Sequence, residues 1–161
     1  MTDTPNANPE DFVDPLSDYE PTQYESELHR VLAEETVGSM QSTPHTLVSA
    51  DTPIAEATKT LRDLKVSSLL VVKDDKLVGI FTERDVLEKA AEQFPKMADQ
   101  PVSAVMTSDP LVVYETDPVG ASLAAIAVAG HRHVPVLKMD GTVAGIISPK
   151  RVLRRLSGHL D

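Results

Sequence analysis

The sequence of 161 residues contains no cysteine and no tryptophan, and only 4% of its residues are aromatic. The absence of cysteine excludes disulfides, zinc–thiolate sites and cysteine nucleophiles. The most apolar stretch, residues 121–129, is too short to span a bilayer. The N-terminus is acidic and polar, unlike a secretion signal or a transit peptide. We therefore expect a cytoplasmic protein without a membrane partner.

Basic residues are also outnumbered by acidic ones, but the excess of acid lies at one end of the chain. Residues 1–36 hold ten acidic residues and one basic residue, a net charge of −9, whereas residues 37–161 hold 15 acidic and 14 basic residues, a net charge of −1. Neither part has the basic footprint that is typical of nucleic-acid binding, so we expect no nucleic-acid partner. Apolar residues make up 41% of the chain, which is enough for a folded core.

The first 36 residues divide into a tail and a helix. Residues 1–20 are rich in acids and proline and poor in apolar side chains, which predicts a disordered acidic tail. Residues 21–36 are predicted to form an N-terminal amphipathic helix. Thr22 and Glu25 make a possible capping box there, and Leu28, Val31 and Leu32 share one helical face.

The remainder of the chain is an internal repeat, with copy one at 37–95 and copy two at 101–160. The offset between equivalent residues is 65 from Pro53 and Pro118 onward, and it becomes 66 at Gly79 and Gly145 because the second turn is one residue longer. Each copy has the pattern of a strand, a helix, two strands around a polar turn and a second helix. This order predicts an α+β fold.

Particular residues support this order. In copy one, strands are predicted at 46–48, 69–72 and 77–81, and a helix opens after Pro53. The second helix is predicted to bury Val86, Leu87, Ala90, Ala91 and Phe94, and the last helix of copy two is predicted to use Val152, Leu153 and Leu156 in the same way. Copies of about 60 residues have small cores, so we expect the two to pack against each other.

The turn after the last strand of copy one carries the clearest chemical signal. Gly79 allows close approach to the backbone, Thr82 ends the strand, and Asp85 lies in the first helical turn on the same side as Thr82. A carboxylate in this place can accept hydrogen bonds from two adjacent ribose hydroxyls. The same T-x-x-D spacing also describes a plain helix cap, so both interpretations remain open.

The tandem period, the order of elements and the pattern Gly79-x-x-Thr82-x-x-Asp85 resemble the cystathionine-β-synthase (CBS) domain family, whose paired copies form a Bateman module. The resemblance covers about residues 37–160. It implies a small mixed sheet in each copy, pseudo-twofold packing of the copies, and a cleft between them for AMP, ADP, ATP or S-adenosylmethionine. By resemblance, Thr82 and Asp85 hold the ribose. The residues implied to enclose the base or to offer backbone contacts are Thr46, Leu47, Leu69, Leu70, Gly79 and Ile80.

Copy two departs from this pattern. It keeps Gly145 and Ser148, but Arg151 stands where copy one has Asp85. Since Ser148 followed by proline starts a helix without an acid nearby, capping does not require Asp85, and this favours a ligand role for that residue. Arginine accepts no hydrogen bonds, so the sequence predicts one ribose site, built on copy one.

Basic residues of copy two form a second candidate group. The resemblance implies that residues in this place face ligand phosphates, and the candidates for a phosphate rim are Arg132, His133, Lys150 and Arg151. The alternative is that Arg132 and Lys150 are solvated surface charges. His131 and His133 have the spacing of a metal-binding pair, but no third ligand is evident, so no metal site is predicted.

No sequence motif of an enzyme active site is present, such as a P-loop, a G-x-S-x-G turn or an H-E-x-x-H pair. The sequence therefore predicts a regulatory module, not an enzyme, with no covalent cofactor and an adenine nucleotide or S-adenosylmethionine as its regulatory ligand. By resemblance it would be a homodimer that acts on an unidentified regulated protein. The alternative is a dimeric adaptor that binds no ligand and recruits partners through its acidic tail.

Overall fold

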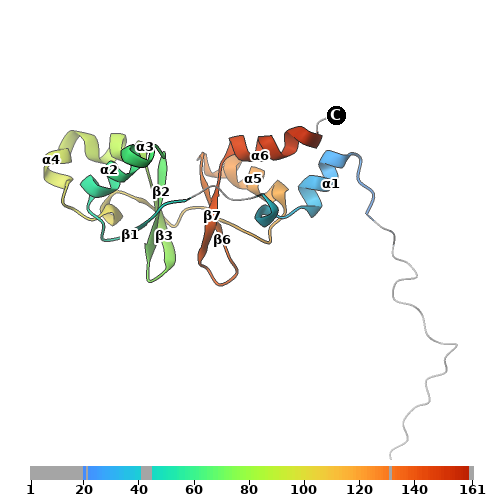
Figure 1. Ribbon diagram of the computed structural model, residues 1–161, viewed down its shortest axis with the longest axis horizontal. Coiled ribbons are helices and arrows are strands. Elements are labelled where there is room, and N and C mark those ends of the chain that lie inside the picture. Colours follow the sequence, from blue (N-terminus) through green and yellow to red (C-terminus); the bar gives the residue numbers. More distant parts are fainter. Residues whose placement is uncertain (1–19, 21, 41–44, 131, 160–161) are drawn as a thin grey trace, which may run out of the picture.

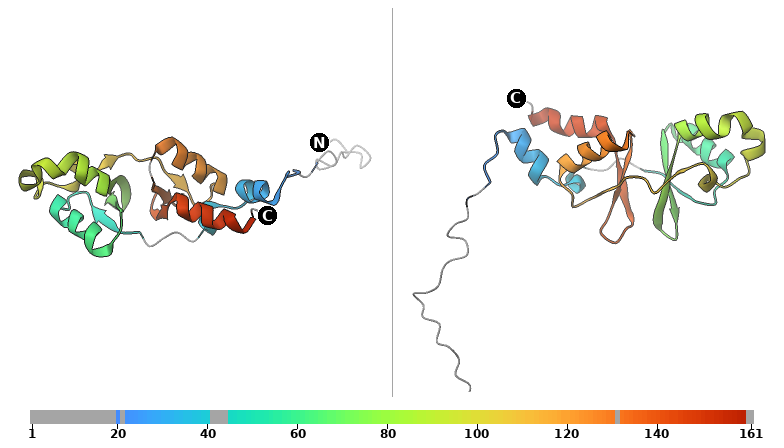
Figure 2. Two further views of the ribbon diagram at one scale, coloured as in Figure 1. Left: turned by 90° about the horizontal axis from the view of Figure 1, so that it is seen from above. Right: turned by 180° about the vertical axis from the view of Figure 1, so that it is seen from behind.

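The two predicted copies lie side by side in the computed structural model, which describes residues 20, 22–40, 45–130 and 132–159. Their sheets face each other at the centre, and their helices lie on the outer sides (Figures 1 and 2). The predicted disordered tail lies outside the described residues, except for Glu20. The central position of the sheets brings strand ends of both copies together.

Copy one has the predicted strand–helix–strand–strand–helix order. Its elements are β1 (Leu47–Ser49), α2 (Ile54–Leu64), β2 (Ser68–Lys73), β3 (Lys76–Thr82), α3 (Glu83–Asp85) and α4 (Phe94–Met97). Strand β1 runs parallel to β2, which pairs antiparallel with β3. The sheet is completed by β4 (Thr107–Ser108), which comes from the start of copy two and pairs with β3.

Copy two repeats this arrangement with a sheet ordered β5-β6-β7. Its elements are β5 (Val113–Tyr114), α5 (Val119–Ala129), β6 (Val134–Leu137), β7 (Val143–Ile147) and α6 (Pro149–Leu156). Strand β5 is parallel to β6, and β6 is antiparallel to β7. The predicted α+β fold with a small mixed sheet in each copy is therefore confirmed.

The N-terminal helix is shorter than predicted. Helix α1 spans Glu27–Glu34, and its cap is Ser26, whose hydroxyl oxygen accepts a hydrogen bond from the backbone of His29. The predicted capping box at Thr22 is wrong because Ser26 adopts the extended backbone and makes the capping bond one turn later. The predicted apolar face is confirmed, since Val31 is fully buried against copy two.

The second helix of copy one is irregular, and this changes which residues it buries. A π-helical turn at Val86–Ala90 and a 3₁₀ turn at Ala91–Gln93 separate α3 from α4. A π turn adds a residue to the turn and so displaces any apolar stripe spaced for an α-helix. Leu87 is therefore 72% exposed and Ala91 is exposed, contrary to prediction. Leu153 of α6 is also exposed, because α6 buries Val152 and Leu156 instead.

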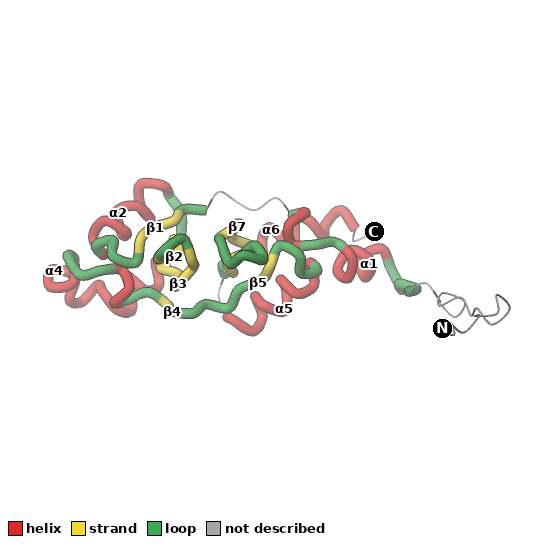
Figure 3. The backbone as a smooth tube through the Cα atoms, turned by 90° about the horizontal axis from the view of Figure 1, so that it is seen from below, coloured by secondary structure: helices red, strands yellow, loops and turns green. Residues whose placement is uncertain are grey.

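The first residues of each copy pack on the other copy. The backbone N–H of Val37 donates to Asp117 O at 2.7 Å, and that of Gly38 donates to Glu115 O at 2.8 Å. In return, β4 joins the sheet of copy one (Figure 3). This exchange ties the copies together through backbone hydrogen bonds.

Apolar packing supplies the remaining contact between the copies. One buried cluster fills copy one and a second fills copy two, where Val31 and Val37 of the N-terminal segment join it. A third, smaller cluster joins Leu70 and Ile80 of copy one to Ile146 of copy two.

Within the described ranges, none of the helices has the length and apolar character to cross a membrane.

Candidate functional site

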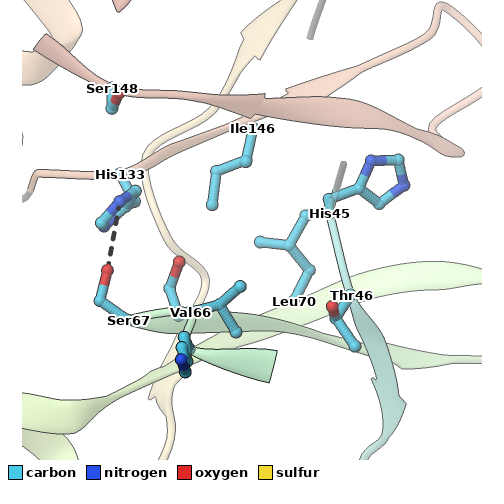
Figure 4. A pocket seen from close by; sticks show the side chains of 10 residues that line it. His45, Thr46, Val66, Ser67, Leu70, His133, Ile146 and Ser148 are labelled. Carbon is cyan, nitrogen blue, oxygen red and sulfur yellow. Dashed lines mark hydrogen bonds between the residues drawn. The ribbon is translucent and has the colours of Figure 1, made fainter. Parts of the chain in front are cut away.

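A pocket of about 190 Å³ lies between the two copies. Its walls come from both (Figure 4): His45, Thr46, Lys65, Val66, Ser67, Ser68 and Leu70 of copy one, and His133, Ile146 and Ser148 of copy two. The Ser67 hydroxyl and His133 Nε2 lie 3.5 Å apart across the boundary between the copies. The site therefore exists only when the two copies are packed together.

The pocket combines apolar side chains with hydroxyl and imidazole groups. Leu70 and Ile146 belong to the cluster between the copies, so this part of the wall is fixed by packing. The hydroxyls of Thr46 and Ser148 can donate or accept hydrogen bonds, as can the neutral ring of His133. Such a lining suits a small organic molecule with a flat apolar part and polar edge atoms.

The surroundings of His133 favour its neutral form. Burial of the ring is the main cause that lowers the pKa of His133 below its ordinary value of 6.5, and the positive charge of Arg132 acts in the same direction. The negative charge of Glu83 opposes these effects. At pH 7 the ring is therefore neutral, and an anion bound beside it would favour its protonation.

This pKa shift makes a prediction for stability. Well above pH 6.5 the ring is neutral in both the folded and the unfolded chain and contributes nothing to the pH dependence of stability. As the pH falls below 6.5, the unfolded chain takes up the proton first because its pKa is higher, so the free energy of unfolding decreases. We expect the parent to lose more stability between pH 7.5 and 5.5 than a His133→Gln variant in urea unfolding. Equal losses in the two proteins would contradict this account.

Thr82 and Asp85 form a complete capping box at the end of β3. The Thr82 backbone N–H and hydroxyl each donate to Asp85 Oδ2 at 2.8 Å. The backbone N–H of Asp85 donates in return to the Thr82 hydroxyl oxygen at 3.3 Å. The capping interpretation of the T-x-x-D spacing is therefore confirmed.

The other carboxylate oxygen of Asp85 is also bonded. Lys89 Nζ donates to Asp85 Oδ1 at 2.7 Å, and the Thr107 hydroxyl donates to the same oxygen at 3.3 Å. Asp85 is only 5% exposed. The structure thus places it beside β4 and not in the lining of the pocket, and a ribose role requires that these donors exchange.

The structure brings together only some of the predicted ligand contacts. Thr46, Leu70 and His133 all line the pocket. Leu69 does not, because its side chain is fully buried in the core of copy one. Leu47 lies on β1 and is 46% exposed.

The other candidates lie outside the lining of the pocket. Ile80 is buried in the cluster between the copies. The space beside Gly79 is taken by the chain itself, since a Cβ there would overlap the sulfur of Met106. Arg132 and Lys150 are exposed, and Arg151 is partly exposed, so their role as a phosphate rim stays a prediction.

The repeat explains several lining residues that the sequence reasoning did not include. Ser148 and Ile146 are the copy-two equivalents of Thr82 and Ile80, and Ser67 is the copy-one equivalent of Arg132. Mapping each predicted residue onto the other copy would have found all three. Conversely, Thr82 occupies in copy one the place that Ser148 has in the pocket.

Comparison with models of known protein families shows which family the chain belongs to. The profile of the CBS domain matches residues 37–92 and again residues 102–158. The chain belongs to the CBS-domain family. Its two CBS copies form a pair, in agreement with the tandem repeat and with the packing of the two sheets.

Similar proteins support this assignment. An uncharacterized 17.7 kDa protein of Acidianus ambivalens is 33% identical over 121 residues, which cover 74% of this chain and 72% of that protein. The structure of CBSX2 in complex with AMP is 27% identical, with a TM-score of 0.66 over 77% of this chain and 97% of that one. The CBS pair of MJ0100, in complex with 5′-methylthioadenosine and S-adenosylmethionine, is 27% identical, with a TM-score of 0.65 over 76% and 96% of the chains.

CBS pairs also occur within larger proteins. The chain covers only about a fifth of several other curated relatives. One is an inosine-5′-monophosphate dehydrogenase of Thermoplasma acidophilum, which is 31% identical over 67% of this chain but only 21% of that enzyme.

Among the residues that the structure describes here, no group of three or more His, Cys, Asp and Glu side chains is placed to hold a metal ion.

Proposed function

We propose that this chain is a regulatory module that binds an adenosine-type ligand, namely AMP, ADP, ATP or S-adenosylmethionine, between its two CBS copies. The observation that carries the proposal is the pocket lined by both copies. Because a ligand held at the boundary between the copies contacts both of them, its binding can favour one packing of the pair over another. The related structures with AMP and with S-adenosylmethionine support the choice of ligand class.

The ribose is proposed to bind at Thr82 and Asp85, which lie outside the described pocket, at the position that the repeat relates to it. By the repeat, these residues occupy in copy one the place of Ser148 and Arg151 in copy two. By the same repeat, Leu111 of copy two is the equivalent of Thr46, which lines the described pocket. We therefore propose that Leu111 lies beside the base of a ligand whose ribose is on Asp85. Leu111 is 44% exposed and thus available for such a contact.

The two positions related by the repeat therefore differ in their ability to bind a ribose. Only the position in copy one has a carboxylate that can accept bonds from two ribose hydroxyls. Arg132 is proposed to contact a ligand phosphate there, since it is the equivalent of Ser67, which lines the described pocket. We expect one ribose-bound ligand per chain.

A thermal-shift screen with AMP, ADP, ATP, S-adenosylmethionine and NAD tests the proposal. A ligand that binds only the folded chain stabilises it by about 2.7 kcal/mol at a hundred times its Kd. For a chain of this length that corresponds to about 5–10 °C in Tm. We expect at least one adenosine-type ligand to give such a shift.

Two ligand controls sharpen the screen. Cytidine monophosphate keeps the ribose and phosphate but changes the base, and ribose 5-phosphate lacks the base altogether. Both are expected to shift Tm by less than the best adenosine-type ligand. If no adenosine-type ligand raises Tm, or if the controls raise it equally, the proposed function fails.

A further inference from the structure

The ammonium group of Lys89 is hydrogen-bonded to the Asp85 carboxylate, the group that a ribose would need as its acceptor. We infer that the Lys89 ammonium is an internal competitor for the Asp85 carboxylate, so that an adenosine-type ligand gains its ribose contacts by displacing Lys89. The inference rests on the proposed function, because it concerns the same carboxylate. It assigns to Lys89 a role in setting ligand affinity.

The acceptor capacity of Asp85 is fully used. An ionised carboxylate offers about four positions for donors. Here they are taken by the Thr82 N–H, the Thr82 hydroxyl, the Lys89 ammonium and the Thr107 hydroxyl. Because a ribose hydroxyl needs one of these positions, at least one donor has to leave before the sugar binds.

Lys89 is better able to leave than either donor group of Thr82. The Thr82 N–H is fixed by the backbone at the end of β3, and the Thr82 hydroxyl also accepts the capping bond from Asp85. The Lys89 side chain is 41% exposed, whereas that of Asp85 is only 6% exposed. The flexible stem of Lys89 can therefore carry the ammonium into water while the carboxylate stays in place.

The contacts of Lys89 also explain why it holds Asp85 in the absence of ligand. Its ammonium donates to the backbone O of Val105 at 2.8 Å as well as to Asp85 at 2.7 Å. In copy two the equivalent residue, Arg155, pairs with Glu35 beside α1, and Arg151 replaces the capping acid. The competition is thus confined to the copy that keeps the carboxylate.

Calorimetric titration of a Lys89→Met variant with 5′-methylthioadenosine tests the inference. This probe has a ribose but no phosphate. The loss of one positive charge in the variant therefore cannot change its affinity through attraction to a phosphate. Methionine keeps the apolar stem and removes the donor. We expect the variant to bind the probe about tenfold more tightly than the parent, because charged hydrogen bonds contribute about 1.5–3 kcal/mol.

Two variants provide the controls, and a third is the replacement test. Lys89→Arg keeps a cationic donor and is expected to bind like the parent, as is Lys59→Met, which makes the same charge change on the exposed face of α2. If Lys89→Met does not fold, Thr107→Val removes the other donor to Oδ1 and is expected to raise affinity in the same direction, though by less.

The outcomes separate the inference from the proposed function. If Lys89→Met binds the probe no more tightly than the parent, or if Lys59→Met shows the same gain, the inference is overturned while the proposed function stands. If neither the parent nor the variant binds the probe, AMP, ADP, ATP or S-adenosylmethionine, both are overturned.

Discussion

An Asp85→Ala variant is expected to lose both ligand affinity and stability. Loss of a charged acceptor for the ribose hydroxyls should weaken adenosine-type ligands about tenfold to a hundredfold. The same change leaves the Thr82 N–H without its acceptor, takes one of the two acceptors of Lys89 and removes half of the capping box. We expect the free energy of unfolding to fall by about 2–4 kcal/mol. Calorimetric titration and urea unfolding measure the two effects.

Glu88→Ala is the matched control for this prediction. Glu88 lies on the same helical segment, but it is exposed and pairs with Arg84 at the surface. Surface pairs of this kind contribute about 0–1 kcal/mol, so this variant should keep nearly all of its stability and affinity. If Asp85→Ala binds every tested nucleotide as well as Glu88→Ala does, Asp85 is only a helix cap.

A Leu70→Ala variant is expected to show the second large effect. Leu70 is 1% exposed, belongs to the cluster between the copies, and lines the pocket. Truncation of a buried leucine leaves a cavity and lowers the free energy of unfolding by about 2–5 kcal/mol. Because the cavity opens at the boundary of the copies, we also expect weaker binding of a ligand on Asp85, through the altered packing of the two copies.

The same substitution at the surface provides the comparison. Leu64 at the end of α2 is 54% exposed, so Leu64→Ala should change the free energy of unfolding by only about 0.5 kcal/mol. Urea unfolding of both variants, followed by titration with the best ligand from the thermal screen, measures the difference. Similar stability of the two variants would contradict the packing described between the copies.

Sequence reasoning predicted the elements whose signals are local. The repeat and the apolar runs identified β2, β3, β6 and β7, because each of these strands is a continuous apolar run next to a polar turn. The irregular helix after Asp85 was not predicted, since a π turn has no marker in the apolar spacing. Leu87 was consequently assigned to the wrong face.

The site was harder to predict than the fold because it is assembled from distant segments. His45 and Ile146 are 101 positions apart in the sequence, and only the packing of the copies brings both to one pocket. For Asp85, the sequence left the cap and the ribose interpretations open. The structure confirms the cap, and it adds Lys89 and Thr107, whose contacts no motif indicates.

Amide hydrogen exchange with and without a saturating adenosine-type ligand tests the central claim most directly, because it locates the ligand as well as detecting it. The account predicts slower exchange where the copies meet, at residues 45–48, 66–70, 80–85 and 145–148, and little change in α4 and α5 on the outer sides. Unchanged exchange in all of these boundary segments, or protection confined to the outer helices, would contradict binding between the two CBS copies.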